Sequence, residues 1–243
     1  MTYNWFARVY DDLMDDTLYE KWFAYTSRYL SSNATLLELG CGTGILGLTL
    51  KEKGYDVSGL DLSEDMLSLA YNRQQEHSIF FPLIQRDMRD LSELANYDGI
   101  VCYSDALCYM ENENELLKVF REAYAHLNTN GYFLFDVHSL YQIELFLKTS
   151  FHAETDGIVF LWDSFEGAYP HSVEHELTFF VERDDQAYDR YEEVHKERTY
   201  KIDTYLELLR KAGFSNIEVT ADFEESVNEK SKRWFFAAQK LGE

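Results

Sequence analysis

The sequence predicts an α/β fold built on a doubly wound, mostly parallel sheet. Three observations carry this prediction. An apolar run, a glycine-rich turn and an amphipathic segment follow one another in residues 36–53. The same alternation of strand-like and helix-like segments continues as far as residue 138, and a helix followed by a hairpin is expected near the C-terminus. Alternating strands and helices are typical of a parallel sheet covered on both faces.

The first unit begins with Leu36 to Leu39, which are apolar except for Glu38 and end in glycines. They are expected to form a short buried strand. Residues 45–53 then have the pattern of a helix, and Gly54 follows at the position where helices favour a left-handed residue. This unit is therefore a strand, a glycine turn and a helix.

Further elements follow in the same order. Helices are expected over residues 63–75, with Ser63 as N-cap, and over residues 112–127. A turn at Asn130 and Gly131 precedes another strand. The expected strands after the first are "YDVSGLDL", "FFPLIQRDM", "YDGIVCYS" and "GYFLFDVH". Ligands bind in such sheets beyond the carboxyl ends of the strands, so the residues that follow each strand are the site candidates.

The two ends of the chain complete the prediction. Near the N-terminus, Met14, Leu18, Trp22, Tyr25 and Tyr29 are spaced as on one face of a helix that covers the sheet. Near the C-terminus, "DTYLELLRKAGF" has the pattern of a helix, and "NIEVTADF" and "KRWFFAAQK" can pair as an antiparallel hairpin.

Residues 141–199 differ from the rest because their pattern is that of antiparallel strands. "SVEHELTFFVE" and "AYDRYEEVHKERTY" predict a hairpin, and "GIVFLWDSFE" a third strand. We expect residues 1–140 and 200–243 to form one domain, and residues 141–199 an insertion that serves as a substrate lid, a dimer surface or a structural cap. The alternating charges are interpreted as protection of an exposed sheet edge.

The charge of the chain limits its partners. There are 22 Lys and Arg residues against 44 Asp and Glu, a formal net charge of -22. Nucleic acids and anionic membranes would be repelled, which favours a small or cationic substrate. The alternative is that the acidity serves only solubility.

The sequence also indicates where the protein is located and whether its cysteines bind a metal. No leader peptide or membrane span is recognisable, so a cytoplasmic protein is expected. Cys41, Cys102 and Cys108 form no C-x-x-C pair, and an odd number argues against a disulfide framework. We expect reduced thiols and no metal site.

The glycines of "LLELGCGTGILGL" fit two registers that imply different enzymes. From Gly42 they spell the dinucleotide fingerprint G-x-G-x-x-G, and from Glu38 they spell E-x-G-x-G-x-G. The strand of the fingerprint should run directly into the first glycine. Counted from Gly40, where the strand is expected to end, Ile45 occupies the place of the third glycine. The dinucleotide register therefore fails where the fold requires it.

The sequence resembles the class I S-adenosylmethionine-dependent methyltransferases, of the bacterial small-molecule type. The resemblance rests on "ELGCGTG", the acid in "GLDLSEDML", "RDM", the aromatic-rich end of the fourth strand, the terminal hairpin and the opening "FARVYDDLM". It covers roughly residues 5 to 140 and 200 to 240. It implies a seven-stranded Rossmann-like methyltransferase fold, S-adenosylmethionine as the cofactor and a small-molecule acceptor.

The resemblance also implies roles for the strand-end residues. A turn beneath the methionine part of the cofactor would comprise Gly40, Cys41, Gly42 and Gly44, because glycines permit close backbone approach. Glu38 would offset the cofactor's ammonium, and Asp61 would accept from both ribose hydroxyls. The adenine would be bound by Leu62, Met66, Asp87 and the backbone of Met88.

Methyl transfer needs a nucleophile held in line, and a base only when the nucleophile arrives protonated. Facing the methyl group we expect Tyr103, Ser104 and Asp105 after the fourth strand and His138 after the fifth. A histidine ordinarily titrates near neutrality, so His138 is a candidate base, with a structural histidine as the alternative. Tyr10 is expected to contact the sulfonium by cation–π attraction or to be a packing aromatic.

Other function classes remain open at this point. A binding module could retain the cofactor pocket without transferring a methyl group, and an NAD-dependent oxidoreductase is a weaker alternative. A role in methylating protein is a third. A homodimer is compatible with the insertion.

Overall fold

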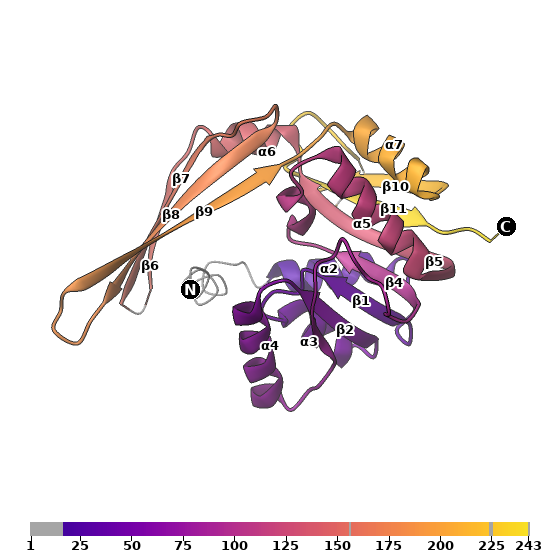
Figure 1. Cartoon of the computed structure of the whole chain (residues 1–243), viewed down its shortest axis with the longest axis horizontal. Coiled ribbons are helices and arrows are strands. Elements are labelled where there is room, and N and C mark those ends of the chain that lie inside the picture. Colours follow the sequence, from indigo (N-terminus) through magenta and orange to yellow (C-terminus); the bar gives the residue numbers. More distant parts are fainter. Residues whose placement is uncertain (1–16, 156, 224–225, 243) are drawn as a thin grey trace.

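Two sheets organise the chain, and one projects from the other as an arm (Figure 1). The computed structural model describes residues 17–155, 157–223 and 226–242. The seven strands of the larger sheet are β1 (Thr35–Leu39), β2 (Asp56–Asp61), β3 (Leu83–Gln85), β4 (Tyr97–Cys102), β5 (Leu127–His138), β10 (Asn216–Ala221) and β11 (Arg233–Gln239). The four strands of the arm are β6 (Phe151–Thr155), β7 (Ile158–Glu166), β8 (Ser172–Glu182) and β9 (Tyr188–Arg198).

The larger sheet has the order β10-β11-β5-β4-β1-β2-β3. Strands β1 to β5 are parallel to one another, whereas β11 lies antiparallel between β10 and β5. The strand order reverses at β1, so the expected doubly wound sheet and terminal hairpin are confirmed. A two-halved dinucleotide fold would continue with parallel strands on this side instead.

Helices cover both faces of this sheet (Figure 1). Their bounds are α2 (Thr17–Ser27), α3 (Ile45–Glu52), α4 (Glu64–His77), the short 3₁₀ helix η1 (Ala106–Tyr109), α5 (Glu113–His126), α6 (Leu140–Phe146) and α7 (Ile202–Ala212). One apolar core lies under α5 and α7, and a second lies under α2 and α3. None of the helices in the described part of the chain is long and apolar enough to cross a membrane.

The ends of the helices follow their sequence signals. Ser63 caps α4 by accepting from the backbone N–H of Met66, and Gly213 ends α7 in the left-handed conformation. The N-terminal helix is confirmed as α2, whose Trp22 and Tyr25 are buried, but Tyr29 lies beyond its end. Met14 and Tyr10 lie outside the described residues.

Strand β5 begins earlier than the sequence predicts. The turn expected at Asn130 and Gly131 lies within the strand, and Leu127 already pairs with Tyr97. Two local features accompany Asn130 and Gly131 within the strand. The pairing register with β4 shifts after Tyr97, and the Asn130 N–H donates to the carbonyl of Lys240 at 2.7 Å.

The arm has one strand and one helix more than the sequence indicates. Strand β6 joins the edge of the three expected strands, and α6 connects the arm to β5. The alternation on β8 is confirmed, since Val173, His175, Leu177 and Phe179 are buried on one face. Strand β9 behaves differently: it buries Glu193, His195 and Glu197 and leaves Val194 exposed.

Candidate cofactor and acceptor site

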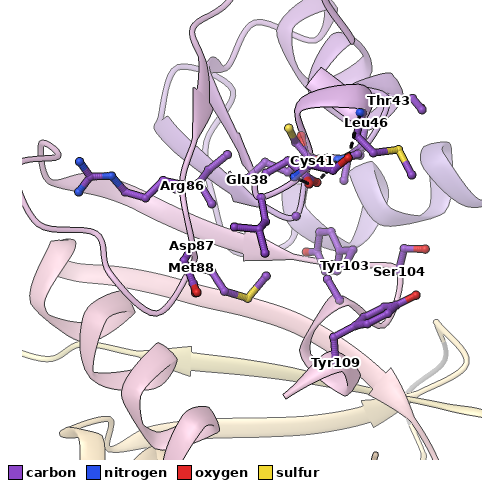
Figure 2. A pocket seen from close by; sticks show the side chains of 18 of the residues that line it. Glu38, Cys41, Thr43, Leu46, Arg86, Asp87, Met88, Tyr103, Ser104 and Tyr109 are labelled. Atoms are coloured by element: carbon purple, nitrogen blue, oxygen red, sulfur yellow. Dashed lines mark hydrogen bonds between the residues drawn. The ribbon is translucent and has the colours of Figure 1, made fainter. Parts of the chain in front are cut away.

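A cavity of about 490 Å³ lies beyond the carboxyl ends of β1, β2 and β4. This is within the range of small-molecule and cofactor sites. Figure 2 shows its side chains, with Tyr103, Ser104 and Tyr109 grouped apart from Cys41 and Leu46 near the glycine turn. Its lining includes ten of the residues predicted from sequence: Glu38, Gly40, Cys41, Gly42, Asp61, Leu62, Met66, Asp87, Met88 and Tyr103.

The glycine turn contributes backbone rather than side chains to the cavity. Gly40, Gly42 and Gly44 all have positive φ angles, of 70°, 51° and 78°. A Cβ atom on Gly42 would meet nothing within 4 Å, so it would enter the cavity. A Cβ on Gly44 would lie 3.0 Å from the Ala70 Cβ, and Gly44 does not line the cavity. Gly42 thus leaves room for a ligand, whereas Gly44 lets α3 approach α4.

Asp61 links the glycine turn to the start of α4. Its two carboxylate oxygens accept from the backbone N–H groups of Gly42 and Ser63, each at 2.8 Å. Burial raises the pKa of Asp61, and the backbone donors oppose that rise. A carboxylate has about four acceptor positions, so two remain for hydroxyl groups of a ligand.

Glu38 is a buried acid whose oxygen Oε2 has no hydrogen-bond partner. The side chain is only 5% exposed, and burial, together with nearby Asp61, raises its pKa to about 8. An orphaned carboxylate oxygen in a cavity wall requires explanation, because an unsatisfied buried polar group is costly. A ligand ammonium would satisfy it.

The wall beyond β2 combines apolar surface with an ion pair. Leu62 is 66% exposed although it is a large apolar side chain, and it lines the cavity beside Met66. Asp87 accepts from Arg89, with one oxygen 2.6 Å from Nη2, and this hydrogen bond lowers the pKa of Asp87. A ligand amino group at Asp87 would share the carboxylate with Arg89.

Aromatic rings form the wall on the side of α2. Trp22 stacks on Tyr103 with ring centroids 6.1 Å apart, and Tyr19 meets Trp22 edge-on at 5.5 Å. All three line the cavity. The Tyr103 hydroxyl is held by Thr26 at 2.9 Å, so this ring is fixed in place. Such faces attract cations within about 6 Å.

Asp105 and His138 lie behind this wall and do not line the cavity. His138 bridges two carboxylates: its Nδ1 is 3.1 Å from Asp105 and its Nε2 is 3.2 Å from Glu197. Burial alone would lower the pKa of His138, but the two carboxylates outweigh it and raise the pKa. Burial raises the pKa of Asp105 to about 6. The two residues are brought together, but within a buried ionic cluster.

Arg233 and Asp136 complete this cluster. The guanidinium of Arg233 lies 2.6 Å from Asp105 and 2.9 Å from Asp136. Asp136 also accepts from Trp22 Nε1 at 2.6 Å. The cluster therefore joins the ends of β5 and β11, the aromatic wall and, through Glu197, the base of the arm.

Sequence analysis missed two residues on the acceptor side of the cavity. Tyr109 from η1 and His195 from β9 both line it, and their side chains are 2.9 Å apart. The signal was the two-residue spacing of Glu193, His195 and Glu197, which places all three on one face of β9. The sequence pattern indicates protection of an edge, whereas the structure buries these three side chains.

These features fit S-adenosylmethionine. The orphaned Glu38 oxygen suits an ammonium, the acceptor positions of Asp61 suit a ribose, exposed Leu62 suits an adenine face, and the empty space over Gly42 admits the ligand backbone. When bound, the cofactor supplies a methyl group on a positively charged sulfur, already activated for displacement.

Comparison with known proteins agrees with this fit. A family model described as a methyltransferase domain matches residues 36–131. The "Putative methyltransferase YqeM" of Bacillus subtilis (strain 168) is 39% identical over 245 residues, covering 99% of this chain and 98% of the relative. The crystal structure of an S-adenosylmethionine-dependent methyltransferase from Clostridium acetobutylicum ATCC 824 is 29% identical, with a TM-score of 0.83 and 99% of each chain covered.

A second solved structure shares the fold at lower identity. It is the sugar N-methyltransferase from Streptoalloteichus sp ATCC 53650, which is 22% identical with a TM-score of 0.79. The match covers 100% of this chain and 94% of that one, so it includes the arm.

Proposed function

Since this chain belongs to the class I S-adenosylmethionine-dependent methyltransferases, we propose that it methylates an amino nitrogen of a small molecule. The cavity carries this proposal. We assign the glycine turn, Glu38 and Asp61 to a cofactor half of the cavity, and its aromatic side chains, together with Tyr109 and His195, to an acceptor half.

In the cofactor half we assign Asp61 to the ribose hydroxyls and Glu38 to the ammonium. Leu62 and Met66 would flank the adenine, and Asp87 and the Met88 backbone would meet its edge. Gly40, Cys41 and Gly42 would support the methionine part. Gly44 would act indirectly, by setting the approach of α3 to α4. These residues bind and orient the methyl group, while the acceptor is placed in line with it.

Charge and aromatic content support an amine as the acceptor. The chain carries a formal net charge of -22, which attracts a cationic substrate. Tyr19, Trp22 and Tyr103 line the cavity, and aromatic rings attract cations. The sugar N-methyltransferase whose match covers the whole of this chain also acts, by its name, on nitrogen.

His138, Asp105 and Tyr103 are proposed to position the acceptor wall rather than to touch the acceptor. His138 and Asp105 lie in the buried cluster, and Tyr103 is fixed by Thr26. Contact of Tyr10 with the sulfonium remains a prediction. So do the cytoplasmic location, the absence of a nucleic-acid partner, the homodimer and the function of residues 141–199 as lid or dimer surface.

Transfer of a labelled methyl group tests this function. The protein is incubated with methyl-¹³C S-adenosylmethionine and a bacterial metabolite extract, divided into an untreated half and a half whose amines have been acetylated. We expect N-methyl signals and S-adenosylhomocysteine in the untreated half only. Label found on oxygen, sulfur or carbon of the product would show another acceptor atom, and label in macromolecules would show a protein or nucleic-acid substrate. Each result would overturn the proposal.

A further inference from the structure

Asp136, near the end of β5, is a buried acid that three groups from different parts of the fold approach. Its Oδ2 accepts from Trp22 Nε1 of α2 at 2.6 Å, and Nη1 of Arg233 from β11 lies 2.9 Å from the same oxygen. Its Oδ1 accepts from the backbone N–H of Asp105, which precedes η1, at 3.0 Å. The Asp136 side chain is 0% exposed and does not line the cavity. One carboxylate thus joins α2, β11 and the turn between β4 and η1.

The turn between β4 and η1 has a backbone conformation that needs support. Ser104 and Asp105 are consecutive residues with positive φ angles, of 55° and 60°, and neither is a glycine. This conformation costs free energy for a residue with a Cβ atom, and it persists where surrounding contacts fix it. The hydrogen bond from the Asp105 N–H to Asp136 is one such contact, and the ion pairs of the Asp105 side chain with His138 and Arg233 are others. Since Ser104 lines the cavity, these contacts also place part of the cavity wall.

The indole ring of Trp22 is the second part of the wall that Asp136 holds. The rings of Trp22 and Tyr103 are stacked with centroids 6.1 Å apart, and both residues line the cavity. The guanidinium carbon of Arg233 lies 5.7 Å from the centroid of the Trp22 ring. An indole has one donor and no acceptor, and this donor bonds to Asp136. Loss of the carboxylate would therefore free the indole to shift against Tyr103.

Resting on the assignment of the aromatic side chains to the acceptor half, we infer that Asp136 is a positioning residue for the methyl acceptor. It acts through Trp22 and through the turn of Ser104 and Asp105, and it touches neither the acceptor nor the cofactor. A wall that is fixed before the acceptor arrives loses little conformational freedom on binding, so the acceptor binds more tightly. The fixed wall also keeps the acceptor in line with the methyl group, where a small displacement slows transfer.

Asp136→Asn tests this role, because the amide has nearly the size of the carboxylate but one acceptor oxygen fewer. Its NH₂ group must face the donors on one side, either the indole or the Asp105 N–H, and two donors cannot bond. The assay counts total label transferred from methyl-¹³C S-adenosylmethionine to a dilution series of the bacterial metabolite extract. We expect the half-saturating extract concentration to rise by about five-fold or more. The affinity for S-adenosylmethionine, measured by calorimetry, should change by less than about two-fold, because Glu38 and Asp61 are untouched.

Asp98→Asn is the matched control, because the Asp98 carboxylate is held in the same way at the start of β4. Its Oδ2 accepts from the N–H and the hydroxyl of Thr35, each at 2.9 Å, and its Oδ1 accepts from Asn128 Nδ2 at 2.8 Å. The amide again meets donors on both sides, but Asp98 does not line the cavity, which lies beyond the other end of the strand. This variant should lower the melting temperature and leave the half-saturating extract concentration unchanged.

Arg233→Lys is a milder second variant that serves if Asp136→Asn does not fold. Arg233 uses two nitrogens, Nη2 at 2.6 Å from Asp105 and Nη1 at 2.9 Å from Asp136, whereas a lysine has one. The positive charge stays in the cluster, but the support of Asp136 is weaker. The half-saturating extract concentration should rise by about two-fold or more, again without a loss of cofactor affinity.

The outcomes keep this inference apart from the proposed function. An unchanged half-saturating concentration in the two cluster variants, an equal change in Asp98→Asn, or an equal loss of cofactor affinity would overturn the positioning role and leave the proposed function standing. Because total label is counted, an acceptor atom other than nitrogen would overturn the proposed function and leave the positioning role standing. If the wild type transfers no label to the extract, both fail. A rise confined to the cluster variants, at unchanged cofactor affinity, supports the inference.

Discussion

Asp61 has two roles that its sequence position does not distinguish. It holds the backbone of Gly42 and Ser63, and it is assigned to the ribose. Asp61→Ala should therefore lower S-adenosylmethionine affinity ten-fold or more and also reduce the free energy of unfolding by about 1 to 3 kcal/mol. Calorimetric binding and urea unfolding measure the two effects. Asp56→Ala, at an exposed carboxylate of the same strand, should change neither appreciably. Unchanged affinity in Asp61→Ala would contradict the ribose assignment.

The raised pKa of Glu38 predicts that the protein releases a proton when the cofactor binds. Its pKa in the free protein is raised from 4.5 to about 8, by burial first and by Asp61 second. Between these values the folded protein holds a proton that the unfolded chain has lost, so the stability of the free protein falls as pH rises through this window. A bound ammonium favours the charged carboxylate, so cofactor binding should release a proton near pH 7 and strengthen as pH rises toward 8.

Calorimetry in buffers of different ionisation enthalpy counts the protons released from Glu38. The measurement compares the wild-type protein with Glu38→Gln, which removes the titrating group while keeping its size. The wild type should release more protons than the variant at pH 7. Equal proton counts would show that Glu38 does not meet the ammonium.

Gly42 and Gly44 belong to one turn, but Gly42 keeps space in the cavity whereas Gly44 lets α3 pack close to α4. Both have positive φ, which costs an alanine about 1 to 2 kcal/mol. In Gly42→Ala the added methyl group would occupy the cavity, so cofactor affinity should fall by about ten-fold or more. In Gly44→Ala it would press on Ala70, so the larger effect should be on stability. Melting temperature and cofactor affinity, measured on both variants, distinguish these two roles. The reverse ranking would contradict these roles.

Glu197 connects the arm to the sheet. It lies between His138 and His175, and removal of one partner from a buried ion pair costs about 3 to 5 kcal/mol. Glu197→Ala should lose about this much in urea unfolding, whereas Glu192→Ala should lose less than about 0.5 kcal/mol. A loss at Glu197 no larger than at Glu192 would show that the cluster does not stabilise the arm.

The ion pair of Glu197 and His138 predicts how the stability lost in Glu197→Ala depends on pH. The pKa of His138 is raised, so its contribution is fully present below pH 6.5 and is lost as pH rises through its folded pKa. The pKa of Glu197 is lowered, so its contribution is present above 4.5 and is lost as pH falls. The penalty of Glu197→Ala should therefore be largest between about pH 4.5 and 6.5.

Local signals predicted most of the sheet and ten of the residues that line the cavity. The strand ends at Gly40 and Asp61 follow from short-range periodicity, glycine and capping residues, and these elements are sequential units. The partner of His195 could not be found in this way. Tyr109 is 86 residues away in the chain, and only the tertiary docking of β9 on η1 brings the two together. The same docking explains why β9 buries charge, which periodicity alone makes resemble an exposed edge.

At the scale of the whole molecule, net charge predicts salt-dependent association. A formal net charge of -22 attracts a cationic ligand, and salt screens this attraction. S-adenosylmethionine carries one more positive charge than S-adenosylhomocysteine. Its association rate, measured by stopped flow, should fall at least about two-fold more than that of S-adenosylhomocysteine between low and high salt. Equal salt dependence would show that net charge does not steer the cofactor.

The central claim is that one cavity holds the cofactor against Glu38 and Asp61 and directs its sulfur toward Tyr109 and His195. A crystal structure with S-adenosylhomocysteine measures this most directly. The account predicts ribose hydroxyls within hydrogen-bond distance of Asp61, the ammonium beside Glu38, and the open side of the sulfur facing Tyr109 and His195. A ligand whose ribose lies away from Asp61, or whose sulfur faces away from His195, would contradict the account.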